Sequence, residues 1–468
     1  MRPSRSSAPA ADTGRLARPE DADLSSISRS WLAETPLAER KLRGQYLTPR
    51  PVAEALVDRV LLEPGMRVLD PGVGTGELLA AVARRCPEVD LTGWDIDPTA
   101  LSAAARLVPA ATLELRSALE PRHFGDPDAK TDDLRRPDIS GSGNGVEKEF
   151  DLVIGNPPYF QVPVTPGLKA RFGEVISGRA NVFALFFKAG LDLLAPQGSL
   201  AYVVPPSMNS GAYFEALREH LVAHALITSL TLLEGTGLFE GANTAAQLLV
   251  LKKGSPQGSA QPFVFEHRDG EAGFRRVIFS RDPQQLEAGF EGRQTLWQLG
   301  YEAVTGTVVW NQQRDALSDQ ALPGSVRLVW SKDLRGGTLA LDPATNDHNS
   351  TPPPIRERQS RSAGQGLSGK RPAYLTGRPA LTGPALLVNR VVGSVGRGEI
   401  RTGLVPAGTP FLAENHVNVI RPKPGSVQQI SWGDLQLRMS RPGVADRLRL
   451  LTGNTQISAT ELTHLLPV

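Results

Sequence analysis

Four consecutive residues, Asn156, Pro157, Pro158 and Tyr159, follow an apolar run at 150–155 and combine an amide, fixed carbonyls and an aromatic ring. Two prolines do not continue a sheet ladder or begin a helix turn readily, so we expect a stiff, extended segment past a strand end. Ligands bind at that edge of open α/β sheets. The Asn156 side-chain oxygen and the Pro157 carbonyl suit the two N–H groups of a planar amine or amide, and Tyr159 offers a stacking face.

A second candidate site is the glycine-rich turn in "VLDPGVGTGELL", between an expected strand at 66–70 and an expected helix at 77–86. Glycines let the backbone turn sharply and approach a ligand closely. The spacing G-x-G-x-G is one residue tighter than the dinucleotide motif, and no Lys-Ser or Lys-Thr pair follows, as a phosphate-binding loop would require. The sequence therefore predicts a binding loop without a pyrophosphate cradle, formed by Asp70, Pro71, Gly72, Gly74 and Gly76.

The end of the next expected strand, at 91–95, supplies an acidic partner for this loop. Asp95 is placed to accept hydrogen bonds from two ribose hydroxyls, and Ile96 to pack on an adenine ring. An ordinary βαβ turn that merely needs glycine is the alternative, but such a turn has no use for Asp95 at this spacing. A cofactor with adenine and ribose but no phosphate is S-adenosylmethionine, which we expect here.

The pattern along the chain predicts an α/β fold with a second, mainly β domain. From about residue 41 to 253, short apolar runs alternate with helical stretches, which is typical of βα units around a parallel sheet. After about 256 the texture changes to short strands with glycines and prolines. We expect a disordered tail at 1–38, a catalytic domain at 39–255 with a mobile polar insertion at about 120–148, a connecting segment at 256–289, and a C-terminal domain at 290–468.

These motifs, with "WDID" and "NPPY" following the glycine loop in that order, resemble those of amino-methyltransferases acting on DNA adenine. The order is that of the gamma group, which includes N6-adenine modification enzymes of restriction systems. The resemblance implies a Rossmann-like class I methyltransferase domain, catalysis by residues 156–159, and a C-terminal target-recognition domain. It also implies that the segment "GQYLTPRPVAEAL" helps to hold the cofactor. The cofactor-binding residues implied in this way are Tyr46, Thr48, Pro49 and Asn156.

Two further positions follow from the same resemblance. Where the family has an acidic residue for the cofactor's adenine amino group, this chain has Ser117, a weaker acceptor. An adenine inside a duplex cannot reach the expected pocket, so the base must rotate out of the stack. The segment at 235–253 resembles the part of the family that supplies a second stacking face, which makes Phe239 the candidate. A buried core phenylalanine is an equally good interpretation of Phe239.

The second half of the chain favours nucleic acid as the substrate. Residues 352–401 contain nine Lys or Arg and two Glu, a local excess that suits a phosphate-tracking surface, although a solvated loop is the alternative. Loose matches to adenine methyltransferase recognition domains suggest that this half reads double-stranded DNA in the major groove. No nuclease signature precedes the catalytic domain, so any restriction endonuclease would be a separate protein. A methyltransferase for an RNA base amine or a protein glutamine is the alternative, and cytosine N4 also fits the tetrad.

The amino-acid composition further limits the class of protein and the chemistry it can perform. Hydrophobic residues make up 40% and the formal net charge is +2, which are ordinary values for a globular protein. The single cysteine, Cys86, excludes a disulfide framework and a covalent cytosine C5 mechanism, because no Pro-Cys pair exists. We find no metal-binding motif, no apolar run of transmembrane length and no signal peptide, so we expect a metal-free enzyme in the cytoplasm.

Overall fold

The structure is a computed structural model that describes residues 24–119, 149–233, 246–254, 261–270, 272–339, 341, 373–390, 399–452 and 456–468. Contacts within the chain separate two units, which are described here one at a time. The N-terminal unit comprises Met1–Arg268, Arg275–Glu287 and Thr452–Asn454. The C-terminal unit comprises Asp269–Phe274, Ala288–Leu451 and Thr455–Val468. The expected mobile insertion at about 120–148 lies outside the described residues.

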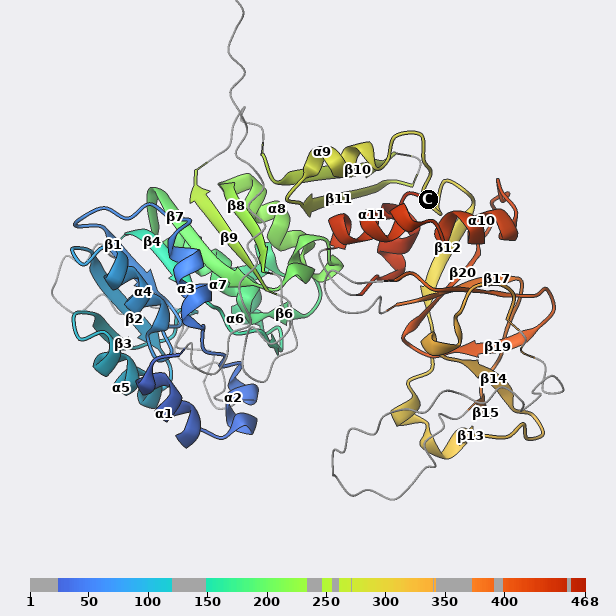
Figure 1. Cartoon of the computed structure of the whole chain (residues 1–468), viewed down its shortest axis with the longest axis horizontal. Helices are drawn as coiled ribbons and strands as arrows, with labels where there is room; N and C mark the ends of the chain where they lie inside the picture. The colour runs from blue at the N-terminus through green and yellow to red at the C-terminus, as the bar shows by residue number, and fades with distance from the viewer. Residues whose placement is uncertain are drawn as a thin grey trace, which may run out of the picture. The chain divides into compact units, whose positions relative to one another are not determined.

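A seven-stranded sheet in the order β3-β2-β1-β4-β7-β9-β8 forms the centre of the N-terminal unit (Figure 1). The five strands from β3 to β7 run parallel, while β9 pairs antiparallel with both β7 and β8. The expected strands are confirmed with small shifts at their ends. Their bounds are β1 Arg67–Asp70, β2 Asp90–Asp95, β3 Thr112–Leu115, β4 Phe150–Gly155, β7 Leu194–Val204, β8 Ala225–Leu233 and β9 Ala246–Lys253.

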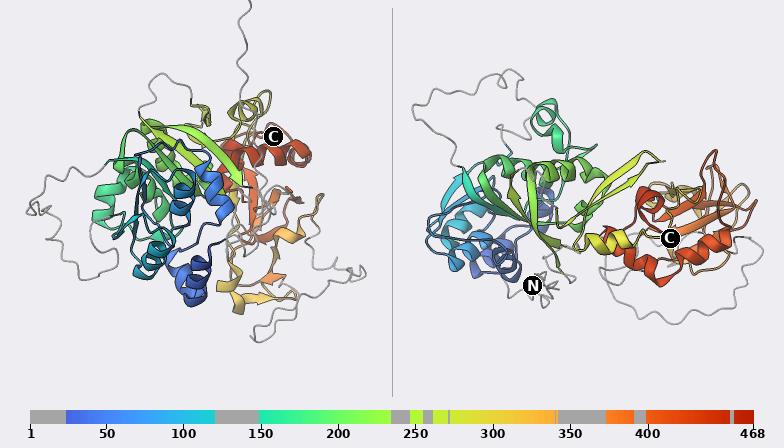
Figure 2. Two further views of the ribbon diagram at one scale, coloured as in Figure 1. Left: turned by 60° about the vertical axis from the view of Figure 1, so that its left-hand side comes forward. Right: turned by 90° about the horizontal axis from the view of Figure 1, so that it is seen from above.

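Helices cover both faces of this sheet (Figure 2), because side chains along each buried strand alternate between two apolar cores. Leu152 and Ile154 of β4 face the core that α3 and α4 cover, whereas Val153 between them faces the core of α6, α7 and α8. The α/β fold class is confirmed. The helices are α3 Arg50–Val57, α4 Glu77–Arg85, α5 Pro98–Leu107, α6 Pro166–Phe172, α7 Val182–Leu193 and α8 Glu215–His224, and β5 Gln161–Val162 pairs with β6 Ala180–Asn181.

The strand order creates a switch point between β1 and β4. From β1 the chain proceeds outward to β2 and β3, and then returns to the other side of β1 to form β4. Val68 pairs with Leu152 and Leu69 with Val153, so the carboxyl ends of the two strands lie level. The glycine loop leaves β1 and the Asn-Pro-Pro-Tyr segment leaves β4 at this edge. In open α/β sheets, a crevice at such a point is where ligands bind.

The first described residues differ from the expected disordered tail at 1–38. Residues Ser26–Glu34 form helix α1, and Leu37–Arg43 form α2. Trp31 of α1 is 5% exposed, and its indole N–H donates to Thr99 Oγ1 of α5 at 3.0 Å. Serine-rich α1 has little apolar periodicity of its own, and its order comes from packing against α5. The prediction was therefore wrong for this stretch.

The expected connecting segment at 256–289 also has structure of its own. Strands β10, Val264–Asp269, and β11, Phe274–Phe279, pair with each other, and helix α9, Pro283–Ala288, follows. Val277 and Phe279 are buried in the α7–α8 core of the N-terminal unit. Most of this segment is thus part of the N-terminal unit and not a linker, because it contributes apolar side chains to that core.

The C-terminal unit is mainly β, as expected. An antiparallel sheet has the order β12-β20-β17-β18, and a second sheet has the order β13-β15-β14-β19-β16. Leu387, Val419 and Phe411 belong to one buried cluster that receives side chains from both sheets. The strands are β12 Tyr301–Thr305, β13 Leu317–Ser318, β14 Val326–Val329, β15 Tyr374–Leu375, β16 Leu381–Thr382, β17 Ala385–Asn389, β18 Thr402–Val405, β19 Pro410–Ala413 and β20 Val417–Pro422, followed by helices α10 Trp432–Met439 and α11 Pro442–Thr452.

Gly44, at the end of α2, provides a test of how the N-terminal segment packs. Its φ is +65°, and an added Cβ would lie 2.7 Å from Phe160 Cδ1 and 3.0 Å from Pro158 Cβ. We predict that Gly44→Ala lowers the free energy of unfolding by about 1–3 kcal/mol, because the methyl group overpacks this contact. Gly65→Ala is the matched control, since Gly65 also has a positive φ but has open space around it. Equal losses in urea denaturation of both variants would contradict the packing argument.

Candidate active site

The glycine loop is shaped by backbone conformations that favour glycine. Gly74 and Gly76 have φ values of +54° and +92°, and Gly76 precedes the first residue of α4. An added Cβ at Gly76 would lie 3.4 Å from Ala104, so glycine also permits α4 and α5 to pack closely. The Val73 N–H donates to the Trp94 carbonyl at 2.9 Å, which fixes the loop against β2.

Two carboxylates connect this loop to the strand ends. Asp70, at the end of β1, is 1% exposed, and its Oδ1 accepts the Gly72 N–H at 3.1 Å. Asp95, at the end of β2, accepts the Gly74 N–H on Oδ2 at 2.8 Å and the Asp97 N–H on Oδ1 at 2.9 Å. Each carboxylate oxygen has a second lone pair, so Asp95 can still accept ribose hydroxyls.

Burial makes this edge of the sheet unfavourable for negative charge. It raises the pKa of Asp70 to about 8; the charge of Asp95 adds to the increase and the Gly72 N–H opposes it. Burial also raises the pKa of Asp95. Within the described part of the chain, neither carboxylate is in an ion pair with a basic side chain. The pair would therefore be stabilised by a cationic ligand, because opposite charge favours the ionised form.

The amide of Asn156 is held from two sides. Its Nδ2 donates to the Tyr46 carbonyl at 3.1 Å, and its Oδ1 accepts the Tyr159 hydroxyl at 3.0 Å. The single proton of this hydroxyl is shared with the Val203 carbonyl, 2.7 Å from the hydroxyl oxygen, which connects the tetrad to β7. Asn156 Oδ1 retains a second lone pair for another donor. The amide thus has one fixed orientation at the end of β4.

Tyr159 is half-buried and contributes to the core as well as to the site. Its ring meets Phe183 of α7 edge to face, with centroids 5.9 Å apart. Burial raises the pKa of Tyr159, so the hydroxyl stays protonated and remains a donor. The part of the ring that is not covered would be the stacking face. Pro157, between the amide and the ring, is buried.

A cavity brings many of the sequence-predicted residues together. Tyr46, Thr48, Asp70, Gly72, Gly74 and Asn156 line it, and Thr48 is 5% exposed. Pro49 lies beside this cavity, at the start of α3, and Pro71 is buried beneath the loop. Gly76 and Asp95 do not line the cavity, although Asp95 reaches it through Gly74. Segments 46–48, 70–78 and 156 therefore form one site.

Three other predicted residues have different surroundings. Ile96 is 66% exposed directly after β2, which leaves an apolar face free for a ring to pack on. Ser117, after β3, accepts the Leu119 N–H on its hydroxyl at 3.2 Å, so this oxygen already stabilises its own turn. Phe239 lies outside the described residues, and its stacking role stays a prediction.

The sequence motifs did not identify several residues at this site. Glu77, the first residue of α4, lines the cavity, is 5% exposed and accepts the Ser25 N–H at 2.9 Å. Thr75, within the loop, shares a 2.6 Å hydrogen bond with Ser28 of α1. Their positions inside and directly after the glycine motif were the available signal. Their contacts with α1 depend on a helix that the sequence did not predict.

The site fits S-adenosylmethionine and not a phosphate-bearing nucleotide. Its paired buried carboxylates suit a cation and ribose hydroxyls, and its glycines allow close approach, while a phosphate would meet negative charge. Asp70, Asp95, Ile96 and the cavity residues would hold the cofactor.

Among the described residues, no three His, Cys, Asp or Glu side chains are grouped to hold a metal ion. No described helix is long and apolar enough to cross a membrane. The sheet and this site together are of the kind expected for a Rossmann-like domain that binds S-adenosylmethionine.

Comparison with known proteins shows which proteins this chain is similar to. Residues 91–239 match the model of the Eco57I restriction-modification methylase family. The Type II methyltransferase M.CvrRI of Paramecium bursaria Chlorella virus XZ-6E is 23% identical over 292 residues, which span 62% of this chain and 68% of that protein. The resemblance expected from the sequence is thus matched by the model of a restriction-modification methylase family and by a Type II methyltransferase.

Methyltransferases whose names give other substrates are also similar. A tRNA1(Val) (adenine(37)-N6)-methyltransferase of the Flavobacteriaceae bacterium strain 3519-10 is 28% identical over 203 residues, covering 42% of this chain and 74% of that protein. A release factor glutamine methyltransferase of Cereibacter sphaeroides is 34% identical over 113 residues, covering 24% and 34%. The matches to these two relatives and to M.CvrRI cover from 34% to 74% of each protein, so the substrate of the whole chain is a matter for proposal.

Asp70 yields a prediction about pH. Because folding raises its pKa from the ordinary value near 4 to about 8, ionising Asp70 favours the unfolded chain; the stability of the cofactor-free protein therefore falls as the pH rises from about 4 to about 8 and levels off above that. Asp70→Asn removes this ionisation and keeps an acceptor for Gly72. We predict that the variant is more stable than the native protein at pH 9 by roughly 2–5 kcal/mol, and by less at pH 6. Urea denaturation that gives the same difference at both pH values would contradict the assignment.

Asp95 yields a prediction about cofactor affinity. Asp95→Ala removes the acceptors for the ribose, and hydrogen bonds to a charged group contribute about 1.5–3 kcal/mol each. We therefore expect calorimetry to show S-adenosylmethionine binding that is roughly 10- to 100-fold weaker. Asp151→Ala is the control, since Asp151 is also on the sheet but is near the start of β4, where it pairs with Arg67. Unchanged affinity in Asp95→Ala would remove Asp95 from the cofactor site.

Proposed function

We propose that this chain is a site-specific DNA adenine-N6 methyltransferase. It would transfer a methyl group from S-adenosylmethionine to the exocyclic amine of an adenine that has rotated out of duplex DNA. The C-terminal unit would recognise the target sequence. The biological role that fits best is that of the modification enzyme of a restriction-modification or phage-defence system, with any restriction endonuclease encoded as a separate protein.

The observation that carries this proposal is the fixed amide of Asn156 beside the cofactor loop. Asn156 lines the same cavity as Asp70 and Gly72, and an added Cβ on the preceding Gly155 would lie 3.4 Å from Asp70 Oδ1. The acceptor at the end of β4 and the cofactor residues at the end of β1 are thus neighbours. This arrangement suits a reaction in which a planar amine is held against a bound methyl donor.

The residues of the chain would supply orientation and electrostatic complementarity. S-adenosylmethionine carries the methyl group on a positively charged sulfonium, so no strong base is needed. The amine of adenine is a poor nucleophile because its lone pair is delocalised into the ring. Asn156 Oδ1 and the Pro157 carbonyl would each accept one N–H of this amine, which favours a tetrahedral nitrogen as the transition state forms. Tyr159 would stack on the base, which contributes roughly 1–3 kcal/mol.

DNA is favoured over the two alternative substrates by the second half of the chain. A glutamine methyltransferase needs few residues beyond its catalytic unit, whereas this chain has a further unit from Ala288 onward with its own core. The similarity to M.CvrRI extends over more of the chain than the similarity to the tRNA or glutamine enzymes. The basic segment at 352–401 would add contacts to phosphates. Most of it lies outside the described residues, so this role rests on the sequence alone.

The substrate class can be tested directly with labelled cofactor. The full-length protein would be incubated with methyl-labelled S-adenosylmethionine and, in parallel, with duplex DNA of many sequences, transfer RNA and release factor. We expect label on duplex DNA, recovered as N6-methyladenine after digestion to nucleosides and mass spectrometry. Label recovered as N4-methylcytosine would change the target base. Label on RNA or on glutamine, with none on DNA, would refute the proposal.

Asn156→Ala tests the mechanism. Removing one acceptor aimed at the transition state typically lowers kcat by about 100- to 1,000-fold, and we expect a loss of that size. Cofactor affinity should fall far less than kcat, because Asn156 is one of several residues that line the cofactor cavity and the carboxylates remain. Tyr159→Phe is the comparison, since it keeps the ring but removes the hydroxyl that orients the Asn156 amide; its loss should be smaller. Single-turnover kinetics in which Asn156→Ala retains the native rate would exclude Asn156 from catalysis.

A further inference from the structure

A cavity in the C-terminal unit is lined by four arginines, three from the α10–α11 region and one from a loop much earlier in the chain. Arg438 lies in the last turn of α10, Arg441 lies between α10 and α11, and Arg447 lies in α11. Arg293 comes from a loop about 150 residues earlier in the chain. Together they line a cavity of about 500 Å³, with Glu291, Gly292, Gly443 and Val468 as its other lining residues. We call these four residues the arginine cluster.

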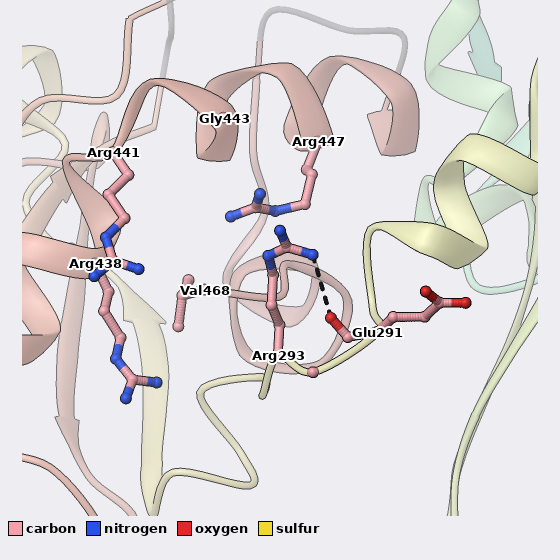
Figure 3. A pocket seen from close by; sticks show the side chains of 8 residues that line it. Glu291, Arg293, Arg438, Arg441, Gly443, Arg447 and Val468 are labelled. Carbon is pink, nitrogen blue, oxygen red and sulfur yellow. Dashed lines mark hydrogen bonds between the residues drawn. The ribbon is translucent and has the colours of Figure 1, made fainter.

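The charge of the arginine cluster is not neutralised by carboxylates. None of its members is in an ion pair in the part of the chain that the structure describes. Glu291 is the acidic residue of the lining, and Figure 3 shows its carboxylate directed away from the four guanidinium groups. Arg449 differs from them: it is on the same helix as Arg447 but is paired with Asp446. Like charges held together in this way favour a bound anion.

Two of the four arginines are held in place and two are free to reach a ligand. Arg447 Nε donates to the Pro467 carbonyl at 2.9 Å, and Arg293 Nη1 donates to backbone carbonyls of its own loop at 3.3–3.4 Å. The side chains of Arg438 and Arg441 make no hydrogen bond to the described residues. Burial lowers the pKa of Arg447; the charges of Arg293 and Arg441 add to the decrease, and that of Asp446 opposes it.

We infer that the arginine cluster binds backbone phosphates of duplex DNA. Guanidinium groups form paired hydrogen bonds with phosphate oxygens, and each phosphate contact releases condensed counterions from the DNA. This contact would fix the position of the C-terminal unit on the duplex without reading its sequence. The inference rests on the proposed function, because it names duplex DNA as the polymer that this unit binds.

The lining of the cavity favours a polymer backbone over a free nucleotide. The described residues that line the cavity include no aromatic ring and no extended apolar wall, so they offer nothing for a base to stack on. Arg293 and Arg441 are exposed and Arg438 and Arg447 are half-buried, so the charge is presented at the surface. A surface of this kind suits phosphates of a duplex that pass across it.

The test compares Arg438→Ala/Arg441→Ala with Arg449→Ala in the full-length protein. The double variant removes two charges that have no structural hydrogen bonds, whereas the control removes an arginine of the same region that already has a carboxylate partner. Binding to a fluorescent duplex would be measured by anisotropy from 50 to 300 mM salt. Circular dichroism and cofactor affinity would confirm that each variant is folded.

We expect the double variant to bind duplex DNA roughly 10- to 100-fold more weakly at 100 mM salt. The slope of log affinity against log salt should be shallower by about 1.8, or about 0.9 for each lost contact. Arg449→Ala should bind as the native protein does. Native-like binding and slope in the double variant would overturn the inference and leave the proposed function intact. A native protein that binds no duplex at 50 mM salt would overturn both.

Discussion

The parallel pairing of β1 with β4 is the constraint on which the site depends. It places the carboxyl ends of two strands side by side, although β2 and β3 and the chain that connects them come between these strands in the sequence. One strand end carries the glycine loop with Asp70, and the other carries Asn156. If β4 slipped by one residue against β1, every side chain of β4 would turn to the opposite face of the sheet and leave its apolar core. The two cores therefore fix the register, and the register fixes the geometry of the site.

The same edge of the sheet shows how structure and function oppose each other. Burying Asp70 and Asp95 together raises the pKa of both carboxyls, which costs stability in the cofactor-free protein and is offset when a cation binds. By contrast, Asn156 is neutral and fully anchored: Tyr46, Tyr159 and, through Tyr159, Val203 determine where its oxygen points. A reaction that depends on orienting an amine needs such rigidity more than it needs a base.

Local motifs predicted the strand ends and loops that the structure brings together, and long-range packing accounts for what was missed. Asp70 ends one strand with a strong apolar pattern, and Gly74 and Asn156 come after such strands, so strand ends and loops could be located from the sequence. Helix α1 has no such pattern; Ser28 and Trp31 become buried only against Thr75 and α5. The arginine cluster unites Arg293 with residues of α10 and α11, which no sequence pattern connects. Phe239 and most of the basic segment at 352–401 lie outside the described residues and remain predictions.

The central claim is that Asn156 and Pro157 together hold the amine of an everted adenine beside the methyl donor. The most direct measurement is a crystal structure of the protein with an unreactive cofactor analogue and a duplex that contains its target site. The account predicts an unstacked adenine whose N6 lies about 2.7–3.2 Å from both Asn156 Oδ1 and the Pro157 carbonyl oxygen. A bound duplex whose adenines all stay stacked, or whose everted base directs another edge at Asn156, would contradict it.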